Sequence, residues 1–263
     1  MWFPILYLQH NQLKKKGFTT IKNVFSTKEA ENYVKKCNEL FEYLLKTGKT
    51  HTFSTVAQII NSPFQYGNKV FYKQVYFPKL DKLLCKLLDK EYVCINTNLI
   101  NRRTFHHPKI TNSMNRTGGW HTDTRTRGGK IVFRGLSYIC TMALEDFSEE
   151  NGGTCYVPGS HLRNYIPKRH VNYKHEYMKI KAGDVTLFDS ALWHKGGKAS
   201  KLSRWSIVNY YGSWWMKPYY DFEKQLGRKK IKKFKDKNLK KMLHYYCMPP
   251  KNDHRGISTV VKS

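Results

Sequence analysis

The sequence predicts a mainly β protein, a jelly-roll β-sandwich with N-terminal helices packed on one outer face. Two segments with helical spacing of apolar residues stand before residue 91, and from Tyr92 onward the apolar period changes to two. Glycine and asparagine clusters then divide the chain into many short pieces. Helices followed by many short strands favour a sandwich whose helices cover one side.

The N-terminal part predicts a short strand and two helices. Residues 17–26 are typical of a strand that runs into a helix start, and Ser26 with Glu29 three residues later forms a capping box. Apolar residues then recur at steps of three and four, which predicts a helix over 28–46. A second run of leucines after Pro78 predicts another helix over 79–90.

Period-two segments predict the strands of the sandwich. In the first segment, Val93, Ile95, Thr97 and Leu99 share one side of an extended chain. The further segments predicted as strands are 135–146, 153–157, 176–181, 185–188 and 204–211.

Length and composition predict one folded domain. A chain of 263 residues with 40% hydrophobic and 14% aromatic residues can bury a sizeable core, which argues against disorder. We expect a single domain over 1–263, in which 1–91 holds the N-terminal strand and helices, 92–215 the jelly-roll core and 216–263 a basic C-terminal extension.

The chain is strongly basic, with 47 Lys and Arg against 19 Asp and Glu and a formal charge of +28. Such a charge attracts polyanions and anionic metabolites, although a lysine bias of the whole chain explains it equally well. Residues 228–241 hold nine basic residues and one acidic residue, which predicts a solvated helix or tail.

The six cysteines show no C-x-x-C pair and no zinc-type spacing, so they predict buried thiols in a reducing compartment. The first residues lack the basic start and apolar run of a signal peptide, and no window is apolar enough for a membrane span. We therefore expect a cytoplasmic enzyme or binding protein.

The segment 118–123, Gly-Gly-Trp-His-Thr-Asp, contains a candidate metal motif. His121 and Asp123 are two residues apart, so in an extended backbone both side chains leave the same face and can share a metal. A His-x-Asp pair alone is a weak motif, and His194 supplies the candidate third ligand. Two histidines and one carboxylate are the ligand set of non-heme iron(II) oxygenases.

Arg204 follows His194 by ten residues, beyond Gly196 and Gly197. This spacing predicts that neighbouring antiparallel strands carry the histidine and the arginine. Arg204 lies in an apolar strand segment, where an unpaired guanidinium is costly and a bound carboxylate would offset that cost.

These motifs occur in an order that resembles the phytanoyl-CoA dioxygenase family of iron(II)- and 2-oxoglutarate-dependent oxygenases. The resemblance begins at the segment 17–26 and runs through Trp-His-Thr-Asp, the segments 150–161 (Glu-Asn-Gly-Gly-Thr-Cys-Tyr-Val-Pro-Gly-Ser-His) and 182–189 (Ala-Gly-Asp-Val-Thr-Leu-Phe-Asp), to His194 and Arg204. It covers about 200 residues and leaves out roughly the last 45.

The resemblance implies a cupin-like double-stranded β-helix with Fe(2+) on His121, Asp123 and His194. It also implies that 2-oxoglutarate chelates the iron through its keto acid end and pairs its far carboxylate with Arg204, while O2 takes the remaining position. Ser206 is a second candidate donor to that carboxylate, and Thr154 is a weaker one that packing explains at least as well.

The family's variations narrow the reaction. Asp123 is present, whereas related halogenases lack the carboxylate, so hydroxylation or another oxidation without halide is favoured. The branch that repairs alkylated nucleic acid carries a second arginine six residues after the first, where this chain has Tyr210. This argues against nucleic acid as the substrate, and the alternatives are a non-oxygenase sugar-binding or isomerase jelly roll and a basic nucleic-acid binder.

Basic residues flank the metal motif and predict an anionic small molecule as substrate, in loops that hold Arg102, Arg103, Arg116, Arg125, Arg127, Lys130 and Arg134. Two aromatic pairs, Trp214-Trp215 and Tyr219-Tyr220, would either stack on a base or sugar or close the open end of the sandwich, and the second interpretation is favoured.

Overall fold

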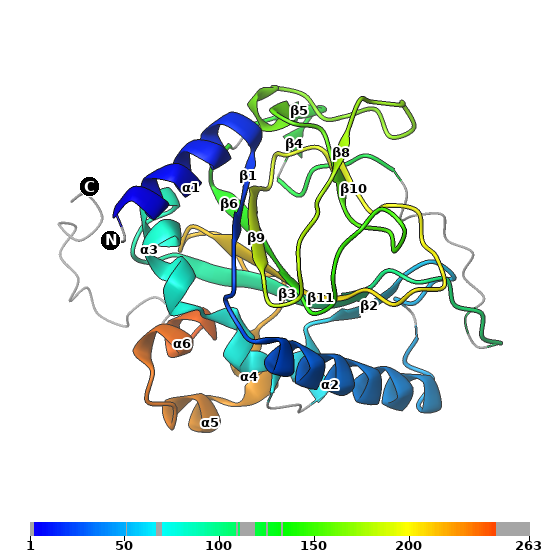
Figure 1. Ribbon diagram of the computed structural model, residues 1–263. Coiled ribbons are helices and arrows are strands. Elements are labelled where there is room, and N and C mark those ends of the chain that lie inside the picture. The colour runs from blue at the N-terminus through cyan, green and yellow to red at the C-terminus, as the bar shows by residue number, and fades with distance from the viewer. Residues whose placement is uncertain are drawn as a thin grey trace.

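A computed structural model describes residues 3–50, 52–66, 70–108, 110, 119–124, 126–132 and 134–245. Two antiparallel sheets lie opposite each other (Figure 1). The larger sheet has the order β1-β9-β6-β11-β3-β2 and the smaller has the order β10-β7-β8. An apolar cluster fills the space between them, with Ile139, Phe188 and Val208 from the larger sheet and Tyr156 from the smaller. The predicted fold class is therefore confirmed.

The strands of the larger sheet are β1 Phe18–Ile21, β9 Val185–Asp189, β6 Ser137–Ala143, β11 Trp205–Gly212, β3 Val93–Asn101 and β2 Gln58–Asn61. Those of the smaller sheet are β10 His194–Lys195, β7 Cys155–Tyr156 and β8 Glu176–Tyr177, and a separate hairpin is formed by β4 Thr126–Arg127 and β5 Lys130–Ile131. The predicted strand segments all contain a strand, although β6, β7 and β8 are shorter than predicted.

The helices are α1 Phe3–Lys16, α2 Thr27–Lys46, α3 Pro78–Leu87, α4 Phe222–Leu226, α5 Arg228–Lys232 and α6 Lys237–Met242, with 3₁₀ turns at Pro63–Tyr66, Phe71–Val75 and Ser160–Leu162. In Figure 1, α2 and the C-terminal helices lie below the larger sheet, and α1 lies beside β1.

The predicted capping box fixes the start of α2. The Glu29 amide donates to the Ser26 hydroxyl at 3.2 Å, and the Ser26 amide donates to the Glu29 carboxylate at 2.8 Å. These backbone and side-chain hydrogen bonds lower the pKa of Glu29. The buried face of α2 packs on the outer face of the larger sheet, where the rings of Phe41 and Trp205 are 6.3 Å apart.

Strand β11 has two chemically different faces, as the period of two requires. Trp205, Ile207 and Tyr211 belong to the core under the helices, whereas Val208 and Tyr210 face the space between the sheets. The inward face is the one that carries candidate site residues.

The basic C-terminal segment is more than a solvated tail. Most of its lysines are exposed, as predicted for a solvated helix, but Ile231 and Met242 are fully buried against the helix-covered core. These apolar residues anchor the segment to the core. None of the helices in the described part of the chain is long and apolar enough to cross a membrane.

Candidate metal centre

His121 and His194 are brought together by the backbone. Each residue's amide donates to the other's carbonyl at 3.0 Å, which forms an isolated antiparallel bridge between the segment before the hairpin and β10. The two imidazole rings lie with their centroids 4.3 Å apart. The Asp123 amide donates to the Ser190 carbonyl at 2.8 Å, which holds the carboxylate at the same end of the sandwich.

The three predicted ligands converge. Their ligand atoms lie within 4.8 Å of one another. Asp123 Oδ2 is 3.3 Å from His194 Nε2, and Asp123 Oδ1 is 3.9 Å from His121 Nε2. His194 is buried, while the His121 side chain is 51% exposed, so one side of the cluster faces solvent.

Backbone carbonyls set the orientation of both imidazoles. His121 Nδ1 lies 2.9 Å from the Gly119 carbonyl oxygen, and His194 Nδ1 lies 2.9 Å from the Leu192 carbonyl oxygen. A carbonyl can only accept, so each Nδ1 carries the proton and each Nε2 keeps its lone pair toward Asp123. Hydrogen bonds of this kind hold a histidine ring in the tautomer and orientation that can bind a metal.

Asp123 and His194 form an electrostatic pair. Burial acts to raise the pKa of Asp123, but the charge of His194 and its hydrogen bond outweigh that effect and lower the pKa. Burial acts to lower the pKa of His194, yet attraction to Asp123 raises it. Tyr210 also hydrogen-bonds to Asp123 from the inward face of β11.

Arg204 is buried, with 4% of its surface exposed, and its guanidinium carbon lies 4.1 Å from the centre of the Phe147 ring. Its Nε has no hydrogen-bond partner, and no ion pair within the described residues involves it. Burial and the neighbouring charge of Arg102 lower the pKa of Arg204 to about 9. A buried cation that forms no ion pair with a carboxylate of the described residues fits an anionic ligand.

The connection between His194 and Arg204 differs from the prediction. The two residues do not lie on neighbouring strands, because β10 belongs to the smaller sheet and β11 to the larger one. Residues 196–204 cross from one sheet to the other. His194 and the strand that follows Arg204 therefore belong to two facing sheets and not to one pair of neighbouring strands.

Ser206 and Thr154, the two further candidates for binding the 2-oxoglutarate carboxylate, lie in different surroundings. Ser206 is buried on the inward face of β11, and its hydroxyl donates to the Ile100 carbonyl at 3.2 Å. Its oxygen can still accept a bond, but its proton is already used. Thr154 is half-buried just before β7, and its backbone carbonyl accepts from the Met178 amide.

Arg102 was predicted in a loop on which an anion could dock, and the structure places it in such a loop but buries it. It is 6% exposed, and its Nε donates to the Gly197 carbonyl at 2.8 Å. A Cβ at Gly197 would lie 2.4 Å from the Gly153 carbonyl oxygen, so glycine permits the close packing of the two loops that surround Arg102. Arg102 and Arg204 together make a strongly cationic interior.

Among the other predicted basic residues, Arg127, Lys130 and Arg134 are exposed, Arg103 is half-buried, and Arg116 and Arg125 lie outside the described residues. Trp214 and Trp215 are 50% and 54% exposed, and Tyr219 is 45% exposed. Tyr220 packs against the core and the Tyr219 ring centre lies 6.3 Å from that of Tyr210, so closure of the sandwich by these pairs stays a prediction.

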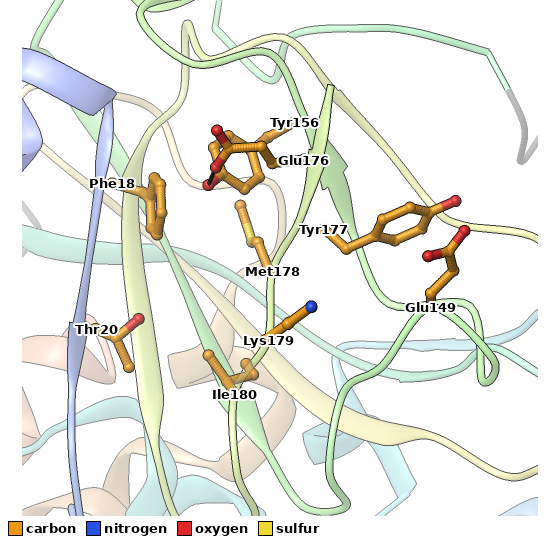
Figure 2. A pocket seen from close by; sticks show the side chains of 9 residues that line it. All are labelled: Phe18, Thr20, Glu149, Tyr156, Glu176, Tyr177, Met178, Lys179 and Ile180. Carbon is orange, nitrogen blue, oxygen red and sulfur yellow. Dashed lines mark hydrogen bonds between the residues drawn. The ribbon is translucent and has the colours of Figure 1, made fainter. Parts of the chain in front are cut away.

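A cavity of about 480 Å³ lies between β1 and β8. Figure 2 shows Phe18, Tyr156 and Met178 around it, with Glu176 accepting a hydrogen bond from Tyr156. Neither the three metal-ligand candidates nor Arg204 lines this cavity. It is therefore separate from the metal centre, although Tyr156 pairs in register with His194.

Comparisons with solved structures show that this fold occurs in other proteins. The fold matches HygX from Streptomyces hygroscopicus, solved with nickel and 2-oxoglutarate bound, with a TM-score of 0.62 and 15% identity over 82% of this chain and 90% of that one. It also matches the epimerase SnoN, solved with Fe3+, alpha ketoglutarate and nogalamycin RO, with a TM-score of 0.58 and 15% identity over 80% of this chain and 84% of that one.

Shorter stretches match curated relatives. A stretch of 83 residues is 35% identical to the dioxygenase hkm4 of Aspergillus hancockii, covering 30% of this chain and 27% of that protein. A stretch of 88 residues is 32% identical to an uncharacterized protein of Mycobacterium tuberculosis, covering 32% of each. The matches thus span about a third or less of these relatives.

The sequence pattern of the phytanoyl-CoA dioxygenase (PhyH) family matches residues 13–204, which includes the three converging side chains and ends at the buried arginine. The chain therefore belongs to the phytanoyl-CoA dioxygenase family of iron(II)- and 2-oxoglutarate-dependent oxygenases.

Proposed function

We propose that this protein is a dioxygenase that uses Fe(II), 2-oxoglutarate and O2 to hydroxylate a C–H bond of an anionic small molecule, with release of succinate and CO2. The observation that carries the proposal is the convergence of His121, Asp123 and His194 in a fold that also buries an unpaired guanidinium, Arg204. The donor set of two imidazole nitrogens and one carboxylate suits non-heme iron(II).

Each residue has a role in this proposal. The Nε2 atoms of His121 and His194 and the carboxylate of Asp123 would hold the metal, because both Nδ1 atoms are engaged by backbone carbonyls. Arg204 would hold the far carboxylate of 2-oxoglutarate, which would remove the cost of an unpaired buried charge. When bound, the iron with its co-substrate and oxygen supplies the oxidising chemistry.

Arg102 adds a second cation to the co-substrate end of the site. Its charge acts on Arg204 strongly enough to lower the pKa of that residue. The nearest carboxylate acting on Arg204, Glu145, already accepts from the Trp205 amide at 2.7 Å and the Ser203 hydroxyl at 2.9 Å. A bound dicarboxylate would therefore lie near two cations, Arg102 and Arg204, and one carboxylate, Glu145, that is already hydrogen-bonded. This excess of positive charge favours binding of the dicarboxylate.

The surroundings keep the reaction dry and positioned. Phe188 packs 5.1 Å from the His194 ring, and Val208 and Tyr156 complete the apolar layer between the sheets. Exposed Arg127 and Lys130 follow Asp123 closely in the chain, which supports an anionic group on the substrate.

The test is an anaerobic titration with Fe(II) and 2-oxoglutarate, followed by the visible charge-transfer band of the chelate. The band should form with the natural protein, disappear in His121→Ala and require much more 2-oxoglutarate in Arg204→Ala. No band at saturating concentrations of both would contradict the proposal.

One of the solved structures with a similar fold is an epimerase, so the type of product also needs a test. Anionic metabolites that stimulate succinate formation should be incubated under ¹⁸O2. One labelled oxygen in the product indicates hydroxylation, whereas an unlabelled product of unchanged mass indicates epimerisation by the same centre.

A further inference from the structure

The hairpin β4–β5 and the loop 162–171 form one continuous surface, which we call the hairpin–loop face. The Ile131 amide donates to the Asn164 carbonyl at 2.8 Å, and the Ile166 amide donates to the Gly129 carbonyl at 3.1 Å. Lys130 and Tyr165 form a β-bridge between these contacts. The two segments therefore keep a fixed position relative to each other.

This face exposes an unusual set of apolar side chains. Leu162 is 58% exposed, Tyr165 53%, Val132 50% and Ile166 40%. Single exposed apolar residues need no explanation, but several on hydrogen-bonded neighbouring segments mark an interaction surface. Because the backbone is held from both sides, these residues are displayed on an ordered platform.

The same face carries positive charge without acidic residues. The chain has no Asp or Glu between Asp123 and Glu145, and none between Glu150 and Glu176. Among the described residues of these two acid-free stretches, 124–144 and 151–175, the exposed basic ones are Arg127, Lys130, Arg134, Arg163, Lys168, Arg169 and Lys174. Asp123 and Asp189 lie beneath the surface, where Asp123 is only 18% exposed and Asp189 is buried.

Arg163 shows how the charge and the apolar groups are combined. Its guanidinium carbon lies 4.6 Å from the centre of the Trp193 ring and 5.9 Å from that of Tyr165, so its stem covers aromatic surface while the charge remains exposed. Lys195 lies over Trp120 in a similar way.

We propose that the hairpin–loop face docks the protein onto membranes that contain acidic lipids. Aliphatic side chains enter the boundary between headgroups and acyl chains, and surrounding lysines and arginines are attracted by the negative leaflet. Nucleic acid fits this surface less well, because Leu162, Val132 and Ile166, three of the four exposed apolar residues named above, are aliphatic and cannot stack on bases. The docking does not depend on the iron chemistry.

The metal centre lies beside this face. Asp123 stands three residues before β4, and the Trp120 amide donates to the carbonyl of Arg169 in the loop. The exposed half of His121 is thus on the side of the molecule that would face the lipid.

The experiment is co-sedimentation of the full chain with vesicles of phosphatidylcholine alone and with about one third phosphatidylserine. We expect binding to the acidic vesicles that weakens as salt increases. The double variant Lys130→Glu and Lys168→Glu should lower the affinity at least about tenfold. The matched control is Lys232→Glu with Lys233→Glu, two exposed lysines in the C-terminal segment, which should change it less than about twofold.

The apolar contribution has its own matched pair. Leu162→Asp should lower the affinity by about tenfold, whereas Leu202→Asp, at a leucine that is 56% exposed elsewhere, should leave it unchanged. Thermal unfolding of each variant verifies the fold, and Ile166→Ser replaces Leu162→Asp if the latter unfolds.

Three results would overturn the proposal. Equal losses from both lysine pairs would assign binding to the overall charge of the chain. A vesicle affinity that Leu162→Asp and Ile166→Ser leave unchanged would mean that the face binds lipid by charge alone. Duplex DNA binding that is lost in the Lys130 and Lys168 variant, with vesicle binding unchanged, would identify nucleic acid as the partner.

Discussion

The two ends of the candidate site differ in whether their buried charges have partners within the protein. At the metal end, Asp123 and His194 shift each other's pKa toward their charged forms, and backbone carbonyls hold both imidazoles. At the co-substrate end, Arg204 is buried beside another cation, Arg102, and its Nε has no partner.

The difference indicates which part of the site is ready before a ligand arrives. The metal end is internally satisfied, so its geometry belongs to the fold itself. The arginine end carries an unfavourable charge that an anion would neutralise, so its stability is linked to ligand binding. Removing a residue from each end should therefore change the stability of the ligand-free protein in opposite directions.

Arg204→Met should have the largest effect on 2-oxoglutarate binding. Losing one partner of a buried ion pair costs about 3–5 kcal/mol, so the affinity should fall by roughly two to four orders of magnitude. The free energy of unfolding without ligand should rise by about 1–3 kcal/mol, because an unpaired charge is removed. Isothermal titration and chemical denaturation measure the two quantities.

The control is Arg228→Met, because Arg228 is exposed and pairs with Glu223 far from the site. It should change neither 2-oxoglutarate affinity nor stability noticeably. If Arg204→Met instead destabilises the ligand-free protein, Arg204 has a structural partner and the contrast between the two ends is lost.

His194→Ala should give the opposite sign at the metal end. It removes a candidate ligand and leaves Asp123 without its main partner, so the ligand-free protein should lose about 1–3 kcal/mol of stability. Metal affinity should fall by about a hundredfold or more. Nickel binding and thermal unfolding test this, with His175→Ala, a half-buried histidine outside the cluster, as the matched control.

The sequence was sufficient to predict the metal end because its signal is local. His121 and Asp123 share a face at a spacing of two, and His194 lies in a recognisable motif of the family. The convergence itself comes from the bridge between His121 and His194, a two-residue contact that no periodicity reveals. Strand β10 is equally short, and the strand predicted at His194 was wrongly placed beside the strand that follows Arg204.

The arginine end was predicted only in part, because its environment is made by distant loops. Arg102 occurs beside Arg103 and has the appearance of a surface residue, yet the packing of Gly197 against Gly153 buries it. Helix α1 was missed for a related reason. Among its residues with assigned burial, only Leu13 is fully buried, so no amphipathic period marks the helix.

The pH dependence of metal binding sharpens the contrast further. The raised pKa of His194 stabilises the metal-free protein at low pH, and this contribution is lost as the pH rises through that pKa. The lowered pKa of Asp123 contributes stability at higher pH that is lost as the pH falls through its folded value. The pair therefore stabilises the metal-free protein between these two pKa values.

A metal needs the neutral imidazole, so its affinity should follow the opposite trend. Below the pKa of His194, which the attraction to Asp123 raises above the ordinary histidine value, nickel affinity should fall by about tenfold for each unit by which the pH is lowered. Nickel titrations at a series of decreasing pH values measure this slope. An affinity that is independent of pH in this range would show that His194 is not protonated in competition with the metal.

Tyr210→Phe should have the smallest effect, because it removes one hydrogen bond from Asp123 and keeps the ring. A bond to a charged group contributes about 1.5–3 kcal/mol at most, and second-shell partners of metal ligands change affinity by about 10–100-fold, so we expect about a tenfold loss of nickel affinity. The affinity for 2-oxoglutarate should change less, because Tyr210 lies at the opposite end of β11 from Arg204. The exposed Tyr219→Phe, whose ring centre is 6.3 Å from that of Tyr210, is the control and should leave nickel affinity unchanged. An equal loss in both variants would mean that the hydroxyls of Tyr210 and Tyr219 act together, and that the hydrogen bond from Tyr210 alone does not position the Asp123 carboxylate.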